Sequence, residues 1–430
     1  MQISQNRGES IKLDRKKLDS RIPFYMKVII FLFPFATFIG SYLNVSVISL
    51  SNIYSLLLMF LVFRQLLKGR LNYIKGYILF FSVMIMYSLF TIIWSRYSPI
   101  GMTIFLPLVT GFVCMAFVAS LDYRNLNLFL RSMSIFTYIV LLIALYETLF
   151  GSYILFDNND FIYVLNKYGF HYPGVAFANP NDLAQYLVCI VPIILAKQFD
   201  EKKVFLPTII FLVTLFILFN TNSRLSIISI FIIVFGYFIV FLSKNKLIFK
   251  RGLFTGVLLY VLINLVSVIG IDLKTFDLLD NFLLINSSMD YFTGRSVLYT
   301  EAFALGVENL ILGAGLGGSY AVTTIGTHNM FLFIFSDLGI LFAVGFILFL
   351  FFLFIKLYRY RKMKLINFHF ASLMLSILVA FPIVSSMSSA NEQRKIIWLI
   401  LGLMLSVLSN YKEKTKLLAI DKRSESCHDY

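Results

Sequence analysis

Two arginines in the second half of the chain have the side chain best suited to hold a phosphate. Arg224 follows the polar stretch Asn220-Thr-Asn-Ser223, and Arg295 lies between Gly294 and Ser296. The guanidinium group is a permanently charged, forked donor that matches phosphate oxygens. Each arginine also has a plainer interpretation, since Arg224 can anchor a helix end at a membrane surface and Arg295 can pair with a nearby acid.

His328 is one of only four histidines and stands between a polar loop and a long apolar run. Its ring ordinarily titrates near neutral pH, so it can exchange a proton in the physiological range. Thr327 and Asn329, on either side, are residues that also cap a helix start. Catalysis by His328, with Asn329 binding substrate, and simple capping therefore stay open as two predictions. His171, in another polar segment, is a weaker candidate of the same kind.

The glycine run Gly313-Ala-Gly-Leu-Gly-Gly318 lies shortly before His328. Backbone N–H groups in a glycine-rich stretch can approach a phosphate closely, so we predict that Gly315 and Gly317 contact the substrate. The run does not match a nucleotide-binding loop, because no strand precedes it and no Lys followed by Ser or Thr ends it. A flexible hinge is the alternative prediction.

Two further polar stretches border apolar runs. Asn179-Pro-Asn-Asp182 is expected to begin a helix, with its acid near the positive end of that helix. Asn179 and Asn181 are also predicted to bind substrate. In the second stretch Arg394 is predicted to contact substrate or a lipid headgroup, unless it pairs with a charged neighbour such as Glu392.

The sequence predicts no metal and no cofactor. Asp157 and Asp160 favour a solvated turn over a metal pair, because Asn and Asp are turn formers. Cys114 and Cys189 lie in apolar runs and Cys427 lies in a polar tail, so no disulfide and no zinc spacing arises.

The segments between these polar stretches are too apolar for a soluble domain. Hydrophobic side chains make up 59% of the 430 residues and charged ones 14%, whereas soluble domains are about 45–50% apolar. A membrane-crossing helix needs about 20 mostly apolar residues, so we predict an all-α polytopic membrane protein with about twelve spans. The predicted spans are residues 24–40, 43–63, 76–94, 99–120, 132–150, 182–199, 204–219, 225–242, 253–270, 329–355, 365–387 and 396–409.

The basic residues predict which side each loop faces. With the N-terminus in the cytoplasm, the inside segments carry 30 of the 37 lysines and arginines, as the positive-inside rule requires. The seven outside are Arg96, Lys167, Arg224, Lys274, Arg295, Arg394 and Lys395. The net charge of +15 therefore indicates topology and contact with anionic lipid, and not nucleic acid.

This topology divides the chain into four parts. Residues 1–270 hold a basic cytoplasmic tail and spans one to nine, and residues 271–328 form a large external loop. Residues 329–409 hold spans ten to twelve, and residues 410–430 form a cytoplasmic tail. Within the loop, apolar residues at helical spacing over 293–305 predict an amphipathic helix at the membrane interface.

In their order along the chain, these motifs resemble the O-antigen ligase and polymerase family of bacterial membrane glycosyltransferases. The similarity covers residues 177–354 by motif and the whole chain by topology, with the largest external loop between spans nine and ten. The first five spans carry no motif. The motifs are Phe177-Ala-Asn-Pro-Asn-Asp-Leu-Ala184, Thr221-Asn-Ser-Arg224, Gly294-Arg295, the glycine run, Thr327-His-Asn329 and Asp337-Leu-Gly-Ile340.

The resemblance implies a donor glycan linked to undecaprenyl pyrophosphate and an acceptor glycan, joined at the outer face of the bacterial inner (plasma) membrane. Arg224 and Arg295 match the family's arginines and would hold the pyrophosphate. His328 matches its histidine and would orient or deprotonate the acceptor hydroxyl. Inversion of the anomeric carbon without a metal is expected. A chain-length regulator and other polysaccharide-assembly proteins are the expected partners.

Within the family we expect a polymerase of O-antigen, capsule or exopolysaccharide. The alternative is a ligase that moves the finished chain to lipid A-core or to a protein. A lipid-linked glycan flippase is the alternative of another class, although the spans have few central charges and no internal repeat is evident. A metal-dependent glycosyltransferase that uses a polyprenyl phosphate is disfavoured, because the first external loop, near Ser41, has no acid.

Overall fold

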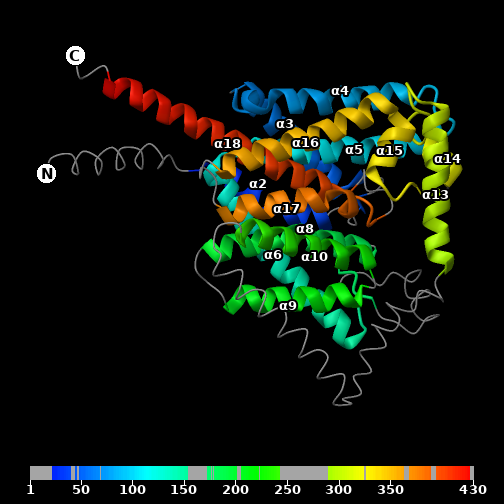
Figure 1. The fold of residues 1–430 in the computed structure, drawn as a ribbon, viewed down its shortest axis with the longest axis horizontal. Helices are drawn as coiled ribbons and strands as arrows, with labels where there is room; N and C mark the ends of the chain where they lie inside the picture. Colours follow the sequence, from blue (N-terminus) through cyan, green and yellow to red (C-terminus); the bar gives the residue numbers. More distant parts are fainter. Residues whose placement is uncertain are drawn as a thin grey trace.

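The computed structural model describes thirteen stretches of the chain, and nearly all of that part is helical (Figure 1). The stretches are residues 22–39, 44–45, 48–67, 69–153, 172–175, 177, 179–200, 205–221, 223–242, 289–323, 326–362, 368–388 and 394–426. The α-helices are α2 (Phe24–Pro34), α3 (Leu50–Leu67), α4 (Lys75–Thr91), α5 (Ser98–Ala119), α6 (Tyr123–Phe150), α8 (Pro180–Asp200), α9 (Phe205–Asn220), α10 (Arg224–Leu242), α13 (Met289–Glu308), α14 (Gly318–Thr323), α15 (Met330–Leu338), α16 (Ile340–Lys362), α17 (Phe368–Val384) and α18 (Lys395–Ser426).

Five helical segments of the described part are long and apolar enough to cross a membrane, which confirms a helical membrane protein at that level. They are Leu50–Leu67, Leu71–Thr91, Ser98–Ala119, Tyr123–Phe150 and Ile340–Arg361. Shorter apolar helices accompany them at Phe24–Ile39, Phe205–Asn220, Arg224–Ile239, Phe370–Val384 and Lys395–Tyr411. The predicted span 253–270 and the first part of the predicted loop, 271–288, lie outside the described residues.

Most helices lie side by side in one bundle, and α13 lies across one end of it (Figure 1). We call this end the α13 end; it includes the helix predicted over residues 293–305. At the opposite end Tyr360 of α16 stacks on Tyr411 of α18, with ring centroids 4.3 Å apart. Basic residues of α4, α6 and α16 gather there, among them Lys75, Arg124 and Arg359, so we call it the basic end. The described parts of α2 and α18 both point towards the basic end.

The predicted tenth span, 329–355, is wrong as a single helix. The chain forms the nine-residue α15 and then the longer α16, with Gly339 between them. Gly339 has a φ of 87°, and a Cβ on it would lie 2.4 Å from the carbonyl oxygen of Ile311. The close approach of that neighbouring segment breaks the helix, and hydrophobicity alone cannot reveal such an approach.

Other helix boundaries also differ from the prediction. α3 begins at Leu50, later than predicted, because a small antiparallel β1–β2 pair, Asn44–Val45 with Ile48–Ser49, precedes it. α6 begins at Tyr123, earlier than predicted, since the Asp122 side chain accepts from the Asn125 N–H at 2.9 Å and caps the helix. α18 continues through most of the predicted tail, 410–430.

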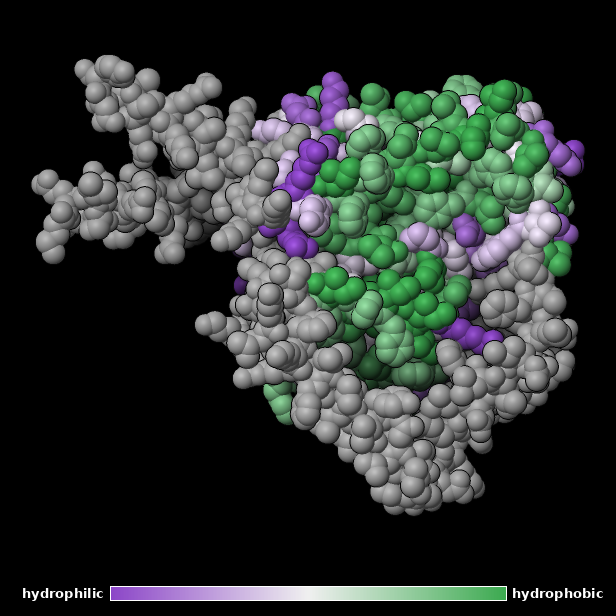
Figure 2. All heavy atoms as spheres, in the orientation of Figure 1, coloured by the Kyte–Doolittle hydropathy of each residue, from purple (hydrophilic) through white to green (hydrophobic). Residues whose placement is uncertain are grey.

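The outward faces of the bundle are apolar, as a surface in contact with lipid requires. Phe60, Leu142 and Leu341 are 69%, 68% and 73% exposed. Hydrophobic side chains cover the middle of the face shown in Figure 2, and hydrophilic ones gather towards its two ends. This band of apolar surface supports the membrane location of the described helices.

α5 and α18 form the closest helix pair at the centre of the bundle. Trp398 is fully buried, and a Cβ on Gly111 would lie 2.3 Å from its ring. Further along, Gly402 approaches Met115. The two contacts, Gly111 with Trp398 and Met115 with Gly402, advance in the same direction along both helices. The helices are therefore parallel, and positions along α5 can be compared with positions along α18.

Candidate functional site

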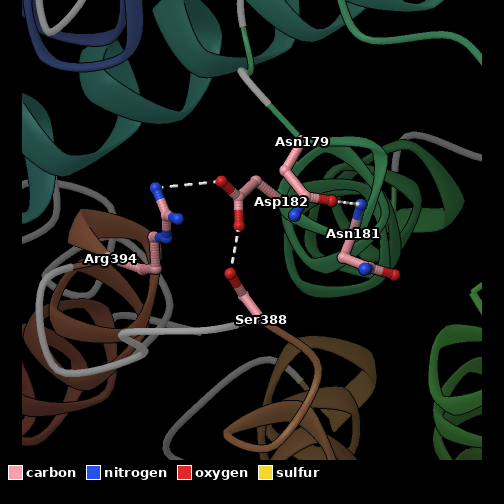
Figure 3. Close-up of polar contacts among 5 residues, drawn as sticks. All are labelled: Asn179, Asn181, Asp182, Ser388 and Arg394. Atoms are coloured by element: carbon pink, nitrogen blue, oxygen red, sulfur yellow. Dashed lines mark hydrogen bonds and ion pairs between the residues drawn. The ribbon is translucent and has the colours of Figure 1, made fainter. Parts of the chain in front are cut away.

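An ion pair joins the start of α8 to the residue before α18 (Figure 3). Arg394 Nη1 lies 2.9 Å from Asp182 Oδ2, and the Ser388 hydroxyl donates to Asp182 Oδ1. The Asp182 side chain is only 4% exposed, whereas that of Arg394 is 30% exposed. The arginine therefore neutralises a buried carboxylate while its own side chain stays partly exposed.

Asn179 caps the first turn of α8 next to this pair (Figure 3). Its side-chain oxygen accepts from the Asn181 N–H at 2.8 Å, and its carbonyl accepts from the Asp182 N–H at 2.9 Å. The helix start predicted at Asn179-Pro-Asn-Asp182 is confirmed, with the acid in the first turn. Glu392, the predicted alternative partner of Arg394, lies outside the described residues, and within them Arg394 pairs with Asp182.

Asn329 caps α15 and also reaches the segment after α17. Its side-chain oxygen accepts from the N–H groups of Phe331 at 2.9 Å and Leu332 at 3.1 Å, which confirms the capping prediction. Its amide donates to Ser386 Oγ at 3.0 Å, and the Met330 N–H donates to the Ser385 carbonyl at 3.1 Å. The polar turn after α17 thus joins the starts of α8, α15 and α18.

We call this cluster the turn site. Its members are polar groups from four separate segments that meet at the turn following α17. They are Asn179, Asn181, Asp182, Asn329, Ser385, Ser386, Ser388 and Arg394. The structure thus brings together four residues predicted separately to bind substrate, Asn179, Asn181, Asn329 and Arg394.

His328 stands directly before the turn site in a strained backbone conformation. Its φ is 49°, in the left-handed region that non-glycine residues rarely adopt. The Thr327 hydroxyl donates to the Asn329 carbonyl at 2.9 Å across it, which fixes the bend. Strain of this kind persists where neighbouring contacts hold it, and it is common at functional sites.

The register of α5 and α18 gives the depth of the ion pair. From Ser98 to Gly111 along α5 the rise is about 20 Å, and from Trp398 back to Arg394 it is about 6 Å. Since Gly111 packs on Trp398, Arg394 lies about 14 Å further into the bundle than the first residue of α5.

A second pair of helices gives the same depth. The hydroxyls of Thr137 in α6 and Tyr186 in α8 are 2.7 Å apart. From Thr137 to Phe150, the last residue of α6, the rise is about 20 Å, and from Tyr186 back to Asp182 it is about 6 Å. The ion pair is therefore recessed about 14 Å from the α13 end by both measures.

Arg224 begins α10 at a similar level. Gly236 of α10 packs on Ser376 of α17, with 3.1 Å from its Cβ position to the serine hydroxyl. The rise from Gly236 to Arg224 is about 18 Å, and that from Ser376 to Val384, the end of α17, is about 12 Å. Arg224 thus lies about 6 Å beyond the end of α17, on the side of the turn that follows it. Arg295 lies within α13, and its side chain is outside the described part.

Gly315 and Gly317 lie apart from the turn site, in a buried structure that we call the glycine clasp, residues 313–319 with Asp337. The N–H of Gly317 donates to Asp337 Oδ2 at 2.8 Å and that of Ser319 to Oδ1 at 2.9 Å. The N–H of Gly315 donates to the Asp337 carbonyl at 3.1 Å. In this structure these N–H groups donate to oxygens of Asp337, while contact with the substrate stays a prediction.

The glycine clasp locks the α4–α5 corner to the C-terminal end of α15. The Leu316 N–H donates to Thr91 Oγ1 at 3.0 Å, and Gly315 and Gly317 adopt φ values of 86° and 88°. Asp337 is fully buried in α15, a helix too short to cross a membrane. Burial raises the pKa of Asp337 to about 7, although the hydrogen bonds to its carboxylate oppose that rise.

Two further groups of buried polar residues were not predicted from the sequence. Glu147 of α6 is buried and accepts from the N–H groups of Gly174 at 2.9 Å and Val175 at 2.8 Å. Val175 has a φ of 53°, a rare conformation for a β-branched residue. The other group is the serines after α17, whose only signal in the sequence is the polar run Ser-Ser-Met-Ser at the end of an apolar one.

Within the described stretches no three His, Cys, Asp or Glu side chains gather to hold a metal ion. Cys114 and Cys189 are buried free thiols. Asp157, Asp160 and His171 lie outside the described residues. At the turn site Arg394 is the more exposed member of the ion pair.

The chain matches no protein-family model and no curated protein. The family resemblance seen in the sequence therefore stays a prediction that rests on short motifs.

Proposed function

We propose that the protein is a membrane glycosyltransferase that polymerises glycans carried on undecaprenyl pyrophosphate. The donor's lipid tail would lie in the membrane and its pyrophosphate at the α13 end. The acceptor would be a hydroxyl of a second lipid-linked glycan. The products would be a longer glycan and free undecaprenyl pyrophosphate.

The observation that carries this proposal is the convergence of polar groups in an otherwise apolar bundle. Asp182, Asn329 and Arg394 come from three distant parts of the sequence, and Asp182 and Asn329 bond to serines of one turn while Arg394 pairs with Asp182. His328 adjoins the turn site, and by the helix register Arg224 lies about 6 Å beyond the end of α17. A lipid-embedded protein rarely keeps charged and amide side chains below its surface without a ligand or pathway to serve.

The proposed chemistry needs only a base and cationic groups. The acceptor hydroxyl attacks the anomeric carbon while the bond from that carbon to the pyrophosphate oxygen breaks. The electron pair of that bond leaves with the pyrophosphate, where Arg224 and Arg295 would stabilise the added negative charge. His328 would take or orient the proton of the hydroxyl. Attack from the opposite face inverts the anomeric carbon.

The depth of the turn site favours a polymerase over a ligase that modifies a protein. A site recessed by about 14 Å admits the end of a thin, extended glycan more readily than a folded protein surface. Asparagine and serine side chains, such as Asn181, Asn329 and Ser386, are suited to hydrogen bonding with sugar hydroxyls.

The test uses purified protein in vesicles with a lipid-pyrophosphate-linked repeat unit and a gel that resolves glycan length. Wild-type protein is expected to give a ladder of products. Arg224→Ala and His328→Ala should each lower the yield by about 100-fold or more. Arg96→Ala, which removes an exposed cation near the same end of the bundle, is the matched control and should leave the ladder unchanged.

The products also separate the alternatives. A single transfer to added lipid A-core or protein, with no ladder, would indicate a ligase. Movement of intact lipid-linked glycan across the vesicle without a new glycosidic bond would indicate a flippase. Full activity of correctly inserted Arg224→Ala and His328→Ala protein would remove both residues from the mechanism.

A further inference from the structure

A groove of about 340 Å³ opens between α4 and α16 near the basic end, far from the turn site. Its walls include Gly76, Tyr77 and Phe80 of α4 and Gly345, Phe349 and Lys356 of α16. Every residue that lines it belongs to the described part of the chain. The proposed function uses none of them.

Two glycines make room for the groove. At Gly76 an added Cβ would meet no atom within 4 Å, so the space beside α4 is open. At Gly345 an added Cβ would lie 2.7 Å from the ring of Phe80, so that ring occupies the place of a side chain on α16. The groove is therefore a feature of these residue types and not only of the helix spacing.

The walls are a rigid aromatic surface. The rings of Tyr77 and Phe349 meet edge to face with centroids 5.5 Å apart. The rings of Phe80 and Phe349 stack with centroids 6.5 Å apart. Such a surface favours a hydrocarbon chain and offers almost no hydrogen bonds to a polar ligand.

Lys356 is the single charged side chain among the lining residues and lies at the basic end of the groove. Its Nζ lies over the ring of Tyr77, 4.6 Å from the centroid. The Tyr77 hydroxyl is buried and has no hydrogen-bond partner among the described residues. A positive charge and an unused hydroxyl thus stand together at one end of an apolar channel.

The length of the groove matches one leaflet of a bilayer. From Lys356 to Gly345 the rise along α16 is about 16 Å. That is half of the hydrocarbon thickness, which is about 30 Å. A ligand with its charge at Lys356 would reach the middle of the membrane with its apolar part.

We infer that this groove binds one acyl chain of an anionic phospholipid, whose phosphate pairs with Lys356. The lipid belongs to the leaflet at the basic end, where the positive-inside pattern already attracts anionic headgroups. The inference goes beyond the proposed function and does not depend on it. There are two alternatives. Lys356 could only extend to the membrane surface without binding a lipid, or a second copy of the chain could cover the groove.

Native mass spectrometry of the purified full-length protein tests the inference by titration with two lipids. Phosphatidylglycerol and phosphatidylcholine with identical acyl chains share the apolar part and differ in net charge. The first phosphatidylglycerol should bind about fivefold more tightly, as expected for one basic residue at an anionic headgroup. Equal affinity of the wild-type protein for the two lipids would overturn the inference.

Two variants locate the lipid, and one is the control. Lys356→Ala should remove the preference, whereas Arg359→Ala, an exposed cation three residues further along α16, should keep it. Gly76→Leu should weaken binding of both lipids, because the new side chain fills the groove without a clash at Cβ. Equal losses in Lys356→Ala and Arg359→Ala, unchanged binding in Gly76→Leu, or a stable dimer that buries the groove would each contradict it. Gel filtration and thermal melting confirm that each variant is folded.

Discussion

The turn site and the glycine clasp are both built from short polar motifs beside apolar helices, yet they differ in how their polar groups are used. In the glycine clasp the carboxylate of Asp337 is fully buried, and both of its oxygens accept backbone N–H groups. In the turn site Arg394 is 30% exposed, and Asn179, Asn181 and Asn329 are partly exposed. The first region has little capacity left for a ligand, whereas the second retains some.

This difference separates a motif that builds the fold from one that is suited to chemistry. A buried polar group stabilises a structure only when its partners are present, and each missing partner has a cost. A partly exposed polar group is less costly to leave without a protein partner, because water can form hydrogen bonds with it. The two regions are joined by α15, which starts at the turn site and ends at the glycine clasp.

The strongest effect is expected in the glycine clasp. Asp337→Ala leaves the N–H groups of Gly317 and Ser319 buried without an acceptor. Each such group costs about 1–3 kcal/mol, so the free energy of unfolding should fall by about 4 kcal/mol. Thermal unfolding in detergent measures the loss.

Asp337→Asn is the matched control, since its side-chain oxygen can still accept one of the two N–H groups. It should therefore lose less stability than Asp337→Ala. Unfolding temperatures within experimental error of wild type for Asp337→Ala would show that the clasp does not hold the α4–α5 corner.

The ion pair of the turn site comes next. Arg394→Ala leaves the buried carboxylate of Asp182 without its charge partner, which costs about 3–5 kcal/mol in a fully buried pair. Because Arg394 is 30% exposed, water relieves part of this cost and a loss of about 2 kcal/mol is expected. Thermal unfolding measures it.

A double variant isolates the pair from the individual side chains. In Asp182→Asn with Arg394→Gln neither charge remains, so stability should recover by at least half of the loss seen in Arg394→Ala. No recovery would mean that the arginine acts through contacts other than the acid.

Helix caps could be predicted from the sequence, whereas contacts between distant segments could not. The cap at Asn329 and the helix start at Asn179 were predictable, because a cap bonds only to its own first turn. The pairing of Asp182 with Arg394 was not, since it depends on how α8 and α18 pack. The break at Gly339 and the use of Gly317 were also not predictable, because another segment of the chain supplies the contact in each case.

A smaller effect is expected where α15 meets the turn site. Asn329→Ala removes the helix cap and the bond to Ser386, and it should cost about 1 kcal/mol of unfolding free energy. Asn329→Ser keeps a cap but is too short to reach Ser386, so it should cost less. Equal losses in the two variants would assign the effect to the Ser386 contact and not to the cap.

The smallest change in stability is expected at His328. The backbone conformation there favours glycine, whereas the proposed chemistry needs the imidazole. Its left-handed backbone costs a non-glycine residue about 1–2 kcal/mol, while glycine loses some of that gain to the entropy of the unfolded chain. His328→Gly should therefore raise the free energy of unfolding by a few tenths of a kcal/mol, up to about 1 kcal/mol. The same variant should lose glycan polymerisation, since no imidazole remains. A variant that is both more stable and fully active would show that the strain serves only the helix cap and that His328 takes no part in the chemistry.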